Sequence, residues 1–276
     1  LAFGKLGGGE LNYSSDIDLL AISGKALDEG REDLFKRVME NLRGDLSAHT
    51  AEGAAYRVDL RLRPFGRSGE LVSSVPRLIQ YYRRQAAVWE LQALLKARPV
   101  AGNRRVGEDF LRECRAFFQQ TGSPAEIAAS LEKMRKTSRD KLNHGIATGR
   151  NIKLGVGGIR DVEFLVQGLQ LIHASEGEKL LSGNTLRALS ALGELGILTV
   201  LQAETLRRDY LFLRRIEHYL QIFEDRQTHT LPRNEQELQA LSRRMLGAQA
   251  GTPQFLDRVS ACMQRVEATY RHFFGA

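Results

Sequence analysis

The hydrophobic pattern of this chain changes near residue 100. Before that point, short apolar runs and alternating residues are mixed with helical spacing, whereas the later residues have helical spacing almost throughout. A chain of 276 residues is also longer than one core usually needs. We therefore predict two domains, a mixed domain over residues 1–104 and an all-helical bundle over residues 105–276.

Strand and helix signals alternate in the first part of the chain. Residues 19–22 form a short apolar run that suits a buried strand, and residues 56–62 alternate strictly between apolar and polar side chains. Apolar residues recur at helical spacing over residues 34–46, and a second helix after Pro76 is expected to carry Leu78, Tyr82, Trp89 and Leu95. This order of strand, helix, strand and helix predicts an α+β fold.

The second part of the chain reads as a series of helices. Glycine, serine and proline residues separate the apolar periodic segments and mark their ends. A stripe of large apolar residues from Leu206 to Phe223 is typical of a bundle core. We expect helices over residues 106–119, 124–145, 158–175, 184–195, 200–226, 234–246 and 252–274.

A glycine-rich segment leads directly into two aspartates. Three consecutive glycines and two serines precede Asp16-Ile17-Asp18, which opens a buried strand. Because side chains alternate along a strand, Asp16 and Asp18 project from one face with α-carbons about 6–7 Å apart. Asp59 lies on the polar face of the later alternating strand. Three carboxylates on adjacent strands predict one shared site.

The expected chemistry of these aspartates is metal binding. Carboxylates held close together repel one another unless a cation lies between them. Hard oxygen ligands select Mg²⁺ or Mn²⁺, and a two-metal site needs a bridging carboxylate such as Asp59. We expect Asp16, Asp18 and Asp59 to be both metal ligands and catalytic residues, with Asp59 also orienting or deprotonating the attacking oxygen.

Phosphate-binding candidates surround these aspartates. A turn without Cβ atoms lets backbone N–H groups approach phosphate oxygens, and a lysine beside it adds positive charge. Ser15 is a candidate hydrogen-bond partner of the metal-bound carboxylates. By the period-two rule Arg61 and Arg63 share the face of Asp59, where they bind phosphate or form structural pairs. The phosphate-binding set is Gly4, Lys5, Gly7, Gly8, Ser15, Arg61 and Arg63.

Composition and charge argue against several other classes of protein. The net charge of +7 comes from arginine pairs interleaved with acidic residues, which is typical of solvated helix faces, so we expect no nucleic-acid partner. No apolar run reaches the roughly 18 residues of a membrane helix. The two cysteines are far apart, which fits a reducing cytoplasm. A chain that begins without Met, in strand-like sequence, is expected to be part of a longer polypeptide.

The order of glycine-rich turn, SDxD strand and later lone aspartate resembles the DNA polymerase β nucleotidyltransferase superfamily. The chain more closely resembles the bifunctional glutamine synthetase adenylyltransferase/adenylyl-removing enzymes, which contain two copies of one module. The stretches that carry this resemblance are GKLGGGELNYSSDIDLLAI, YRVDLRLRPFGRSGELV, YYRRQAAVWELQALLKARPVAGN, NIKLGVGGIRDVEFLVQGLQLI and YLFLRRIEHYLQIFEDRQTHTLP.

The resemblance implies an activity and a set of partners. Three of these stretches look more like the N-terminal, adenylyl-removing half, which implies phosphorolysis of an adenylylated tyrosine on glutamine synthetase, with orthophosphate as substrate and ADP as product. The ATP-using adenylylating half is the enzymatic alternative. A regulatory module that binds the PII signal protein, glutamine or glutamine synthetase is the third. A nucleic-acid polymerase would need a basic, aromatic-lined groove that the sequence does not indicate.

One of the stretches that carry the resemblance contains the start of a helix in the second part of the chain. Gly157 and Gly158 precede a helix whose first turn contains Asp161, with Glu163 after it. Acidic residues at this position are stabilised by the helix dipole, so capping is one interpretation. The resemblance favours a second interpretation, in which Asp161 or Glu163 faces the active cleft.

Overall fold

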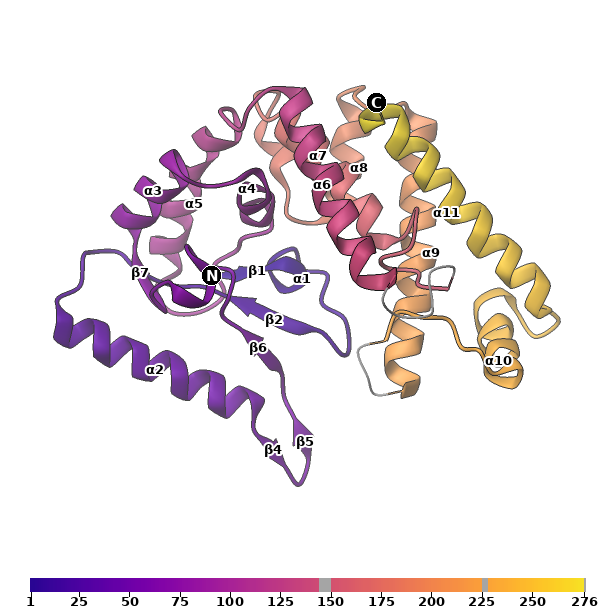
Figure 1. Ribbon diagram of the computed structural model, residues 1–276, viewed down its shortest axis with the longest axis horizontal. Helices are drawn as coiled ribbons and strands as arrows, with labels where there is room; N and C mark the ends of the chain where they lie inside the picture. The colour runs from indigo at the N-terminus through magenta and orange to yellow at the C-terminus, as the bar shows by residue number, and fades with distance from the viewer. Residues whose placement is uncertain (144–149, 225–227, 276) are drawn as a thin grey trace. The chain divides into compact units, whose positions relative to one another are not determined.

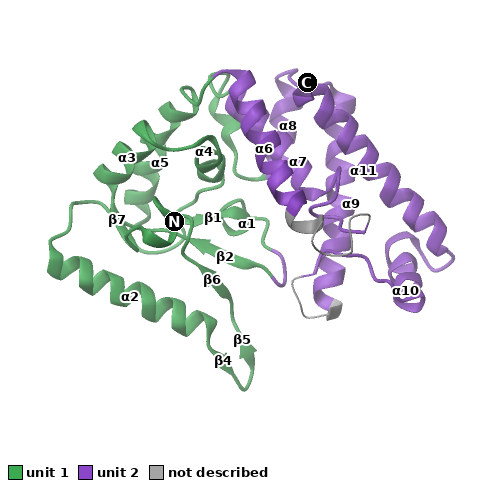
Figure 2. Cartoon of the chain, in the orientation of Figure 1, with its two compact units in different colours: residues 1–11, 15–122, 174–184 green, residues 12–14, 123–173, 185–276 purple. Residues whose placement is uncertain are grey.

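The computed structural model describes residues 1–143, 150–224 and 228–275, and these form two compact units (Figures 1 and 2). Small sheets occur in the first unit and a bundle of helices forms the second, which confirms the predicted α+β class. Unit 1 comprises residues 1–11, 15–122 and 174–184, and unit 2 comprises residues 12–14, 123–173 and 185–276.

The central sheet of unit 1 has three strands in the order β1-β2-β6. Strand β2 pairs antiparallel with β1 on one side and parallel with β6 on the other. Its residue Ile17 is buried in the core, while the residues on either side of it are half-buried. The strands are β1 (Ala2–Phe3), β2 (Asp16–Leu19) and β6 (Arg57–Asp59).

Shorter pairs of strands and several helices complete unit 1. Strand β3 pairs parallel with β7, and β4 forms a hairpin with β5. Helix α2 contacts β6 and β7, and α3 packs on α5. The elements are α1 (Gly4–Gly7), β3 (Ala21–Ser23), α2 (Glu29–Ser47), β4 (His49–Thr50), β5 (Gly53–Ala54), the 3₁₀ helix η1 (Gly66–Ser68), β7 (Val72–Ser74), α3 (Val75–Arg84), α4 (Val88–Leu95), α5 (Arg104–Phe118) and the 3₁₀ helix η2 (Glu178–Leu181).

Unit 2 is a helical bundle with a continuous apolar core. Helix α7 packs against α6, α8, α9 and α11, and its apolar residues are almost all buried. The buried face of α9 includes Leu206, Tyr210, Leu213, Ile216 and Leu220, as the predicted stripe requires, and the side chain of Phe223, its last predicted member, is outside the described part of the chain. The helices are α6 (Pro124–Asn143), α7 (Ile159–Ile172), α8 (Thr185–Glu194), α9 (Val200–Glu224), α10 (Glu235–Leu246) and α11 (Thr252–Phe274).

The seven helices predicted in the second part of the chain are confirmed, with ends that shift by at most a few residues. The predicted ends at residues 145 and 226 lie outside the described residues. Helix α5, which the sequence assigns to the helical domain beyond residue 104, packs on α3 within unit 1. None of the helices in the described ranges combines the length and hydropathy that a membrane span needs.

Three predictions in the first part need correction. The single helix predicted after Pro76 is two helices, because α3 ends at Arg84 and α4 begins at Val88. The apolar run at residues 19–22 is divided between β2 and β3, because the chain leaves one sheet at Leu20 and joins another at Ala21. The alternating strand predicted over residues 56–62 ends at Asp59, whose Oδ1 atom accepts a hydrogen bond from the backbone N–H of Arg61 at 2.8 Å. This local bond turns the chain out of the sheet.

Candidate active site

The parallel register of β2 and β6 brings the three aspartates onto one face. Asp16 lies opposite Arg57, Ile17 opposite Val58, and Asp18 opposite Asp59. Residues directly opposite one another in a sheet project to the same side, and side chains alternate along each strand. Asp16, Asp18 and Asp59 therefore share one face, which we call the aspartate face, and Ile17 points into the core.

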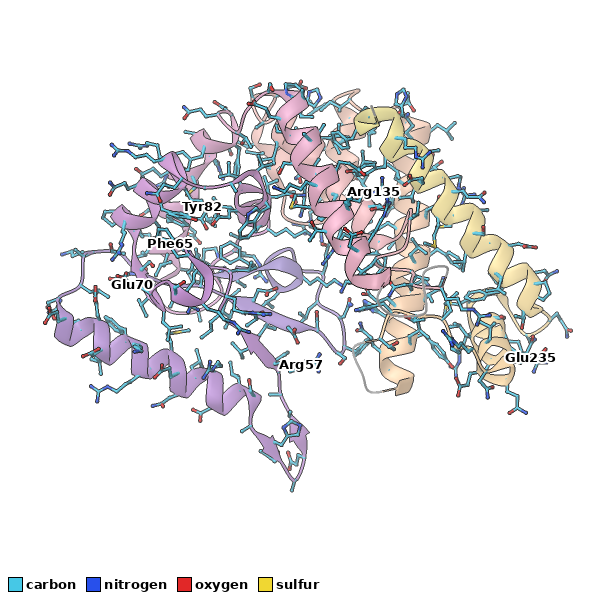
Figure 3. The ribbon with its side chains drawn as sticks, viewed as in Figure 1. Arg57, Phe65, Glu70, Tyr82, Arg135 and Glu235 are labelled. Carbon is cyan, nitrogen blue, oxygen red and sulfur yellow. The ribbon has the colours of Figure 1, made fainter. Side chains whose placement is uncertain are left out.

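Two arginines pair with carboxylates of the aspartate face. The Nε atom of Arg57 donates to Oδ1 of Asp16 at 2.6 Å, and Arg57 extends from β6 (Figure 3). The guanidinium of Arg61 donates from Nε to both carboxylate oxygens of Asp59, at 2.9 and 2.8 Å, and also from Nη2. These bonds from Arg61 hold the pKa of Asp59 below its ordinary value, so its carboxylate stays ionised at neutral pH.

The donor set of the aspartate face fits a hard divalent cation. Three carboxylates on one face offer the oxygen ligands that Mg²⁺ and Mn²⁺ prefer. Within the described residues, no three His, Cys, Asp or Glu side chains are close enough together to hold a metal ion. The guanidinium groups of Arg57 and Arg61 now occupy oxygens of Asp16 and Asp59. A cation bound by all three aspartates would compete with these two arginines for carboxylate oxygens.

Gly4 lies against the carboxylate of Asp18. A Cβ atom at position 4 would be 2.6 Å from Oδ2 of Asp18, and Gly4 has a backbone φ of 55°. Both observations require a residue without a side chain, because a left-handed backbone favours glycine and the carboxylate fills the adjacent space. Lys5 follows in α1 and is half-buried. Gly4 thus adjoins the aspartate face, and the phosphate-binding role of Lys5 remains a prediction.

Gly7 and Gly8 pack against backbone atoms of unit 1. A Cβ atom on Gly7 would overlap the carbonyl oxygen of Lys96, and one on Gly8 would lie 2.6 Å from the carbonyl oxygen of Gly183. The N–H of Gly8 also donates to the carbonyl of Gly4 at 3.0 Å. These contacts explain both glycines by packing, and their phosphate-binding role remains a prediction. Ser15 directly precedes β2 and is half-buried.

Arg61 and Arg63 do not share a face, because β6 ends before both of them. Arg63 donates from Nε to the carbonyl of Gly69 at 3.0 Å, from Nη2 to that of Arg67 at 3.2 Å, and from Nη1 to that of Leu60. Its guanidinium therefore closes the loop that follows β6. Arg61, by contrast, remains directed at Asp59.

Sequence reasoning missed two charged contacts in this region. Arg57 pairs with Asp16. The alternation of residues 56–62 places Arg57 on the same face as Asp59, and this placement could have indicated the pair. Glu10 and Lys96 form a buried ion pair with a distance of 2.8 Å between Oε2 and Nζ. These two residues are far apart in the sequence, so no local pattern indicated that they meet.

Other residues of unit 2 hold the buried side chain of Asp161 in place. Asp161 is 4% exposed, and Arg135 on α6 donates to both of its carboxylate oxygens at 2.9 and 2.7 Å. The N–H of Gly157 donates to the same carboxylate at 2.7 Å. Tyr210 donates to Oε1 of Glu163 at 3.4 Å, and Glu163 is half-buried. The contacts of Asp161 show a structural role at this helix start, and the placement of Asp161 or Glu163 at an active cleft stays a prediction.

A buried polar cluster involves two of the sequence stretches singled out above. Glu217 is fully buried, and its Oε2 atom accepts a hydrogen bond from Arg214 at 2.9 Å. Lys153 and His229 lie 3.8 and 3.1 Å from Oε1 of Glu217. Burial lowers the pKa of Lys153 below its ordinary value. Polar residues of these two stretches thus contact one another in the interior of unit 2.

Comparisons with known proteins match both parts of the chain. The family model for glutamate-ammonia ligase adenylyltransferase matches residues 1–113, and the model for GlnD PII-uridylyltransferase matches residues 125–274. The two models together span nearly the whole sequence, and each covers mainly one of the two predicted domains.

Curated relatives share one name, "Bifunctional glutamine synthetase adenylyltransferase/adenylyl-removing enzyme". The protein from Idiomarina loihiensis is 37% identical over 100% of this chain and 30% of its own length. Those from Streptomyces avermitilis and Streptomyces coelicolor are 41% and 39% identical, each over 88% of this chain and over 24% and 25% of their own lengths. This chain, which spans less than a third of each relative, belongs to the family of bifunctional glutamine synthetase adenylyltransferase/adenylyl-removing enzymes.

Proposed function

We propose that the aspartate face carries out metal-dependent adenylyl transfer on glutamine synthetase, which makes this chain a nucleotidyltransferase. The observation that supports this most strongly is the register of β2 and β6, which sets Asp18 opposite Asp59 with Asp16 on the same face. The names of the curated relatives supply the substrate protein and the transferred group.

Asp16, Asp18 and Asp59 would hold Mg²⁺ or Mn²⁺ in this proposal. The bound cation would neutralise negative charge that develops around phosphorus during transfer. Arg57 and Arg61, once released from Asp16 and Asp59, would present donors to phosphate oxygens. Asp59 would also orient or deprotonate the attacking oxygen.

The proposed direction is phosphorolytic removal. An oxygen of orthophosphate attacks the adenylyl phosphorus, the bond from phosphorus to the tyrosine oxygen breaks, and the tyrosine oxygen takes a proton. The products are ADP and unmodified glutamine synthetase. The resemblance of the RLRPFG, NIKLGVGGIR and DRQTHTLP stretches to the adenylyl-removing half supports this direction.

ATP-dependent adenylylation is the second candidate function, because the relatives' shared name includes both directions. The partners in either direction are glutamine synthetase and phosphate, ADP or ATP. A role as a regulatory module for PII or glutamine, the absence of a nucleic-acid partner and a cytoplasmic setting remain predictions from the sequence.

The test measures labelled ADP released from adenylylated glutamine synthetase in the presence of Mg²⁺ and orthophosphate. The intact chain is compared with its Asp16→Asn and Asp59→Asn variants and with Asp33→Asn, which removes an exposed carboxylate on α2. A parallel reaction supplies labelled ATP and unmodified glutamine synthetase, and measures label bound to the protein.

If the chain removes adenylyl groups, the intact chain and the Asp33→Asn variant should release ADP in a phosphate-dependent reaction. The rate of ADP release should fall at least about 100-fold in the Asp16→Asn and Asp59→Asn variants. Label transfer from ATP without ADP release would identify the adenylylating direction instead. Absence of both reactions, with retained binding of glutamine synthetase, would contradict an enzymatic role.

A further inference from the structure

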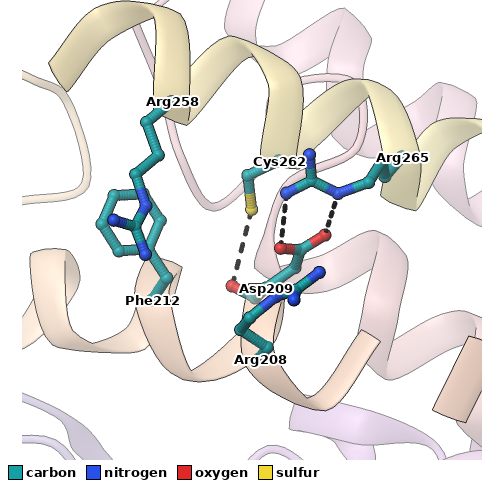
Figure 4. A pocket seen from close by; sticks show the side chains of 6 residues that line it. All are labelled: Arg208, Asp209, Phe212, Arg258, Cys262 and Arg265. Carbon is teal, nitrogen blue, oxygen red and sulfur yellow. Dashed lines mark hydrogen bonds and ion pairs between the residues drawn. The ribbon is translucent and has the colours of Figure 1, made fainter. Parts of the chain in front are cut away.

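Unit 2 contains a small pocket between α9 and α11 that has no part in the proposed chemistry. Its volume is about 300 Å³, and basic side chains dominate its lining. Arg208 and Arg258 are exposed, whereas Asp209, Phe212 and Cys262 are buried. The lining residues, shown in Figure 4, are Arg208, Asp209, Phe212, Arg258, Cys262 and Arg265.

Two of the three guanidinium groups are held in place. Arg265 donates from Nε and Nη2 to the two carboxylate oxygens of Asp209, at 2.8 and 2.7 Å. The guanidinium of Arg258 lies over the ring of Phe212, with its Cζ atom 4.8 Å from the ring centroid (Figure 4). Because these groups are already positioned, a ligand would order few side chains when it binds.

The pocket carries a surplus of positive charge. Three arginines and one aspartate line it, which leaves two positive charges in excess. The carboxylate of Asp209 already accepts bonds from Arg265 on both oxygens. Burial raises the pKa of Cys262 to about 12, so its thiol is neutral, and it donates to the carbonyl of Asp209. Nothing else in the lining opposes an anion.

Arginines on exposed helix faces are usually just solvated. This group differs in that it surrounds a concave space and includes two guanidinium groups fixed by neighbouring side chains. Guanidinium groups bind tetrahedral oxyanions through paired N–H donors. We infer that the pocket formed by Arg208, Arg258 and Arg265 binds a phosphate-type dianion, at a site separate from the aspartate face.

The test is a calorimetric titration of the intact chain with inorganic phosphate and, separately, with AMP as a phosphomonoester. The variants are Arg208→Gln and Arg258→Gln, and Arg207→Gln is the matched control, because Arg207 is an exposed neighbour on α9 outside the pocket. A conservative variant, Arg208→Lys, keeps the charge but removes the paired donors. Circular dichroism checks that each variant is folded.

We expect Arg208→Gln and Arg258→Gln to weaken phosphate binding about tenfold or more, and Arg207→Gln to change it less than twofold. Arg208→Lys should fall between the two groups. Asp59→Asn should retain the arginine-dependent binding, which separates this site from the aspartate face. Tighter binding of AMP through the same arginines would identify a phosphomonoester as the source of the dianion.

Equal weakening of phosphate binding in all three glutamine variants would mean that only the net charge of the chain matters, and would overturn the inference. Unchanged binding of both probes in the Arg208→Gln and Arg258→Gln variants, or no binding to the parent chain, would also overturn it.

Discussion

At the residue scale, the position of Asp18 depends on the absence of a side chain at Gly4. The carboxylate of Asp18 occupies the space where a Cβ atom of residue 4 would project. Gly4 also has the positive φ that side chains disfavour. One residue in the glycine-rich segment therefore fixes where a carboxylate of the aspartate face can lie.

The Gly4→Ala substitution should lower the rate of adenylyl transfer at least about tenfold, because its methyl group would displace Asp18. Gly9→Ala is the matched control, since Gly9 also has a positive φ, of 68°, but no atom lies within 4 Å of its Cβ position. Steady-state rates of both variants test this. Equal losses would assign the effect to backbone strain and contradict a role in placing Asp18.

The Arg61→Gln substitution should raise the pKa of Asp59, because hydrogen bonds from Arg61 are the main cause of its lowered value. The Asp59 pair stabilises the folded chain above the ordinary carboxyl pKa of about 4, and this contribution is lost as the pH falls through the lowered pKa. Carboxyl ¹³C NMR titration measures the change.

Arg67→Gln is the control for that titration, because Arg67 has the weakest effect among the causes of the lowered pKa of Asp59. A pKa of Asp59 that does not change in Arg61→Gln would mean that the pair does not persist in solution.

At the scale of elements, an ion pair joins α6 to the start of α7. Arg135 and Asp161 are both about 95% buried and share two hydrogen bonds, and Glu267 on α11 also contacts Arg135. Removing Asp161 takes the bidentate partner from Arg135, which keeps Glu267, and leaves the N–H of Gly157 without its acceptor, so it costs far more than losing an exposed pair.

Asp161→Ala should lower the free energy of unfolding of unit 2 by about 3–5 kcal/mol. Glu132→Ala is the matched control, because Glu132 contacts the same arginine at 3.6 Å but is 53% exposed, and it should cost at most about 1 kcal/mol. Urea denaturation followed by circular dichroism measures both. Similar costs would show that burial does not determine the strength of this pair.

The helices of unit 2 were predictable because each repeats its apolar spacing over several turns, as in the buried face of α9. The strands of unit 1 were harder to predict. Strands β1, β4 and β5 have two residues each, too few to show a period. The end of β6 depends on one side chain, Asp59, that bonds to the backbone two residues later.

At the scale of the whole molecule, unit 1 is not one continuous segment. Residues 174–184 belong to it although the preceding helices belong to unit 2. Asn184 donates from Nδ2 to the carbonyl of Gly8 at 3.1 Å, and Arg115 forms an ion pair with Glu178. Leu180 in the same segment is fully buried. No local pattern of residues indicates this return of the chain to unit 1.

A fragment of residues 1–122 should unfold at a lower urea concentration than unit 1 does in the intact chain. The fragment lacks residues 174–184 and exposes the surfaces that they cover. The fluorescence of Trp89, the one tryptophan of the chain, reports on unit 1 in both proteins. An unchanged midpoint would show that residues 174–184 add no stability to unit 1.

The candidate site was predicted in part. The order of the glycine-rich segment and the three aspartates identified the aspartate face, because strand alternation and parallel pairing follow simple rules. The pairing of Arg57 with Asp16 was missed, since it depends on side-chain conformations, whereas a structural pair was one of the two roles expected for Arg61. The packing of Gly7 against Lys96 was missed because these residues are distant in the sequence.

The most direct measurement is the binding of Mn²⁺ to the intact chain, followed by electron paramagnetic resonance of the free ion. We expect saturable binding that Asp16→Asn and Asp59→Asn each weaken about tenfold or more, while Asp33→Asn on the exposed surface of α2 has no effect. Binding that is equally strong in all three variants, or absent from the parent chain, would contradict the assignment of the aspartate face as a metal-dependent catalytic site.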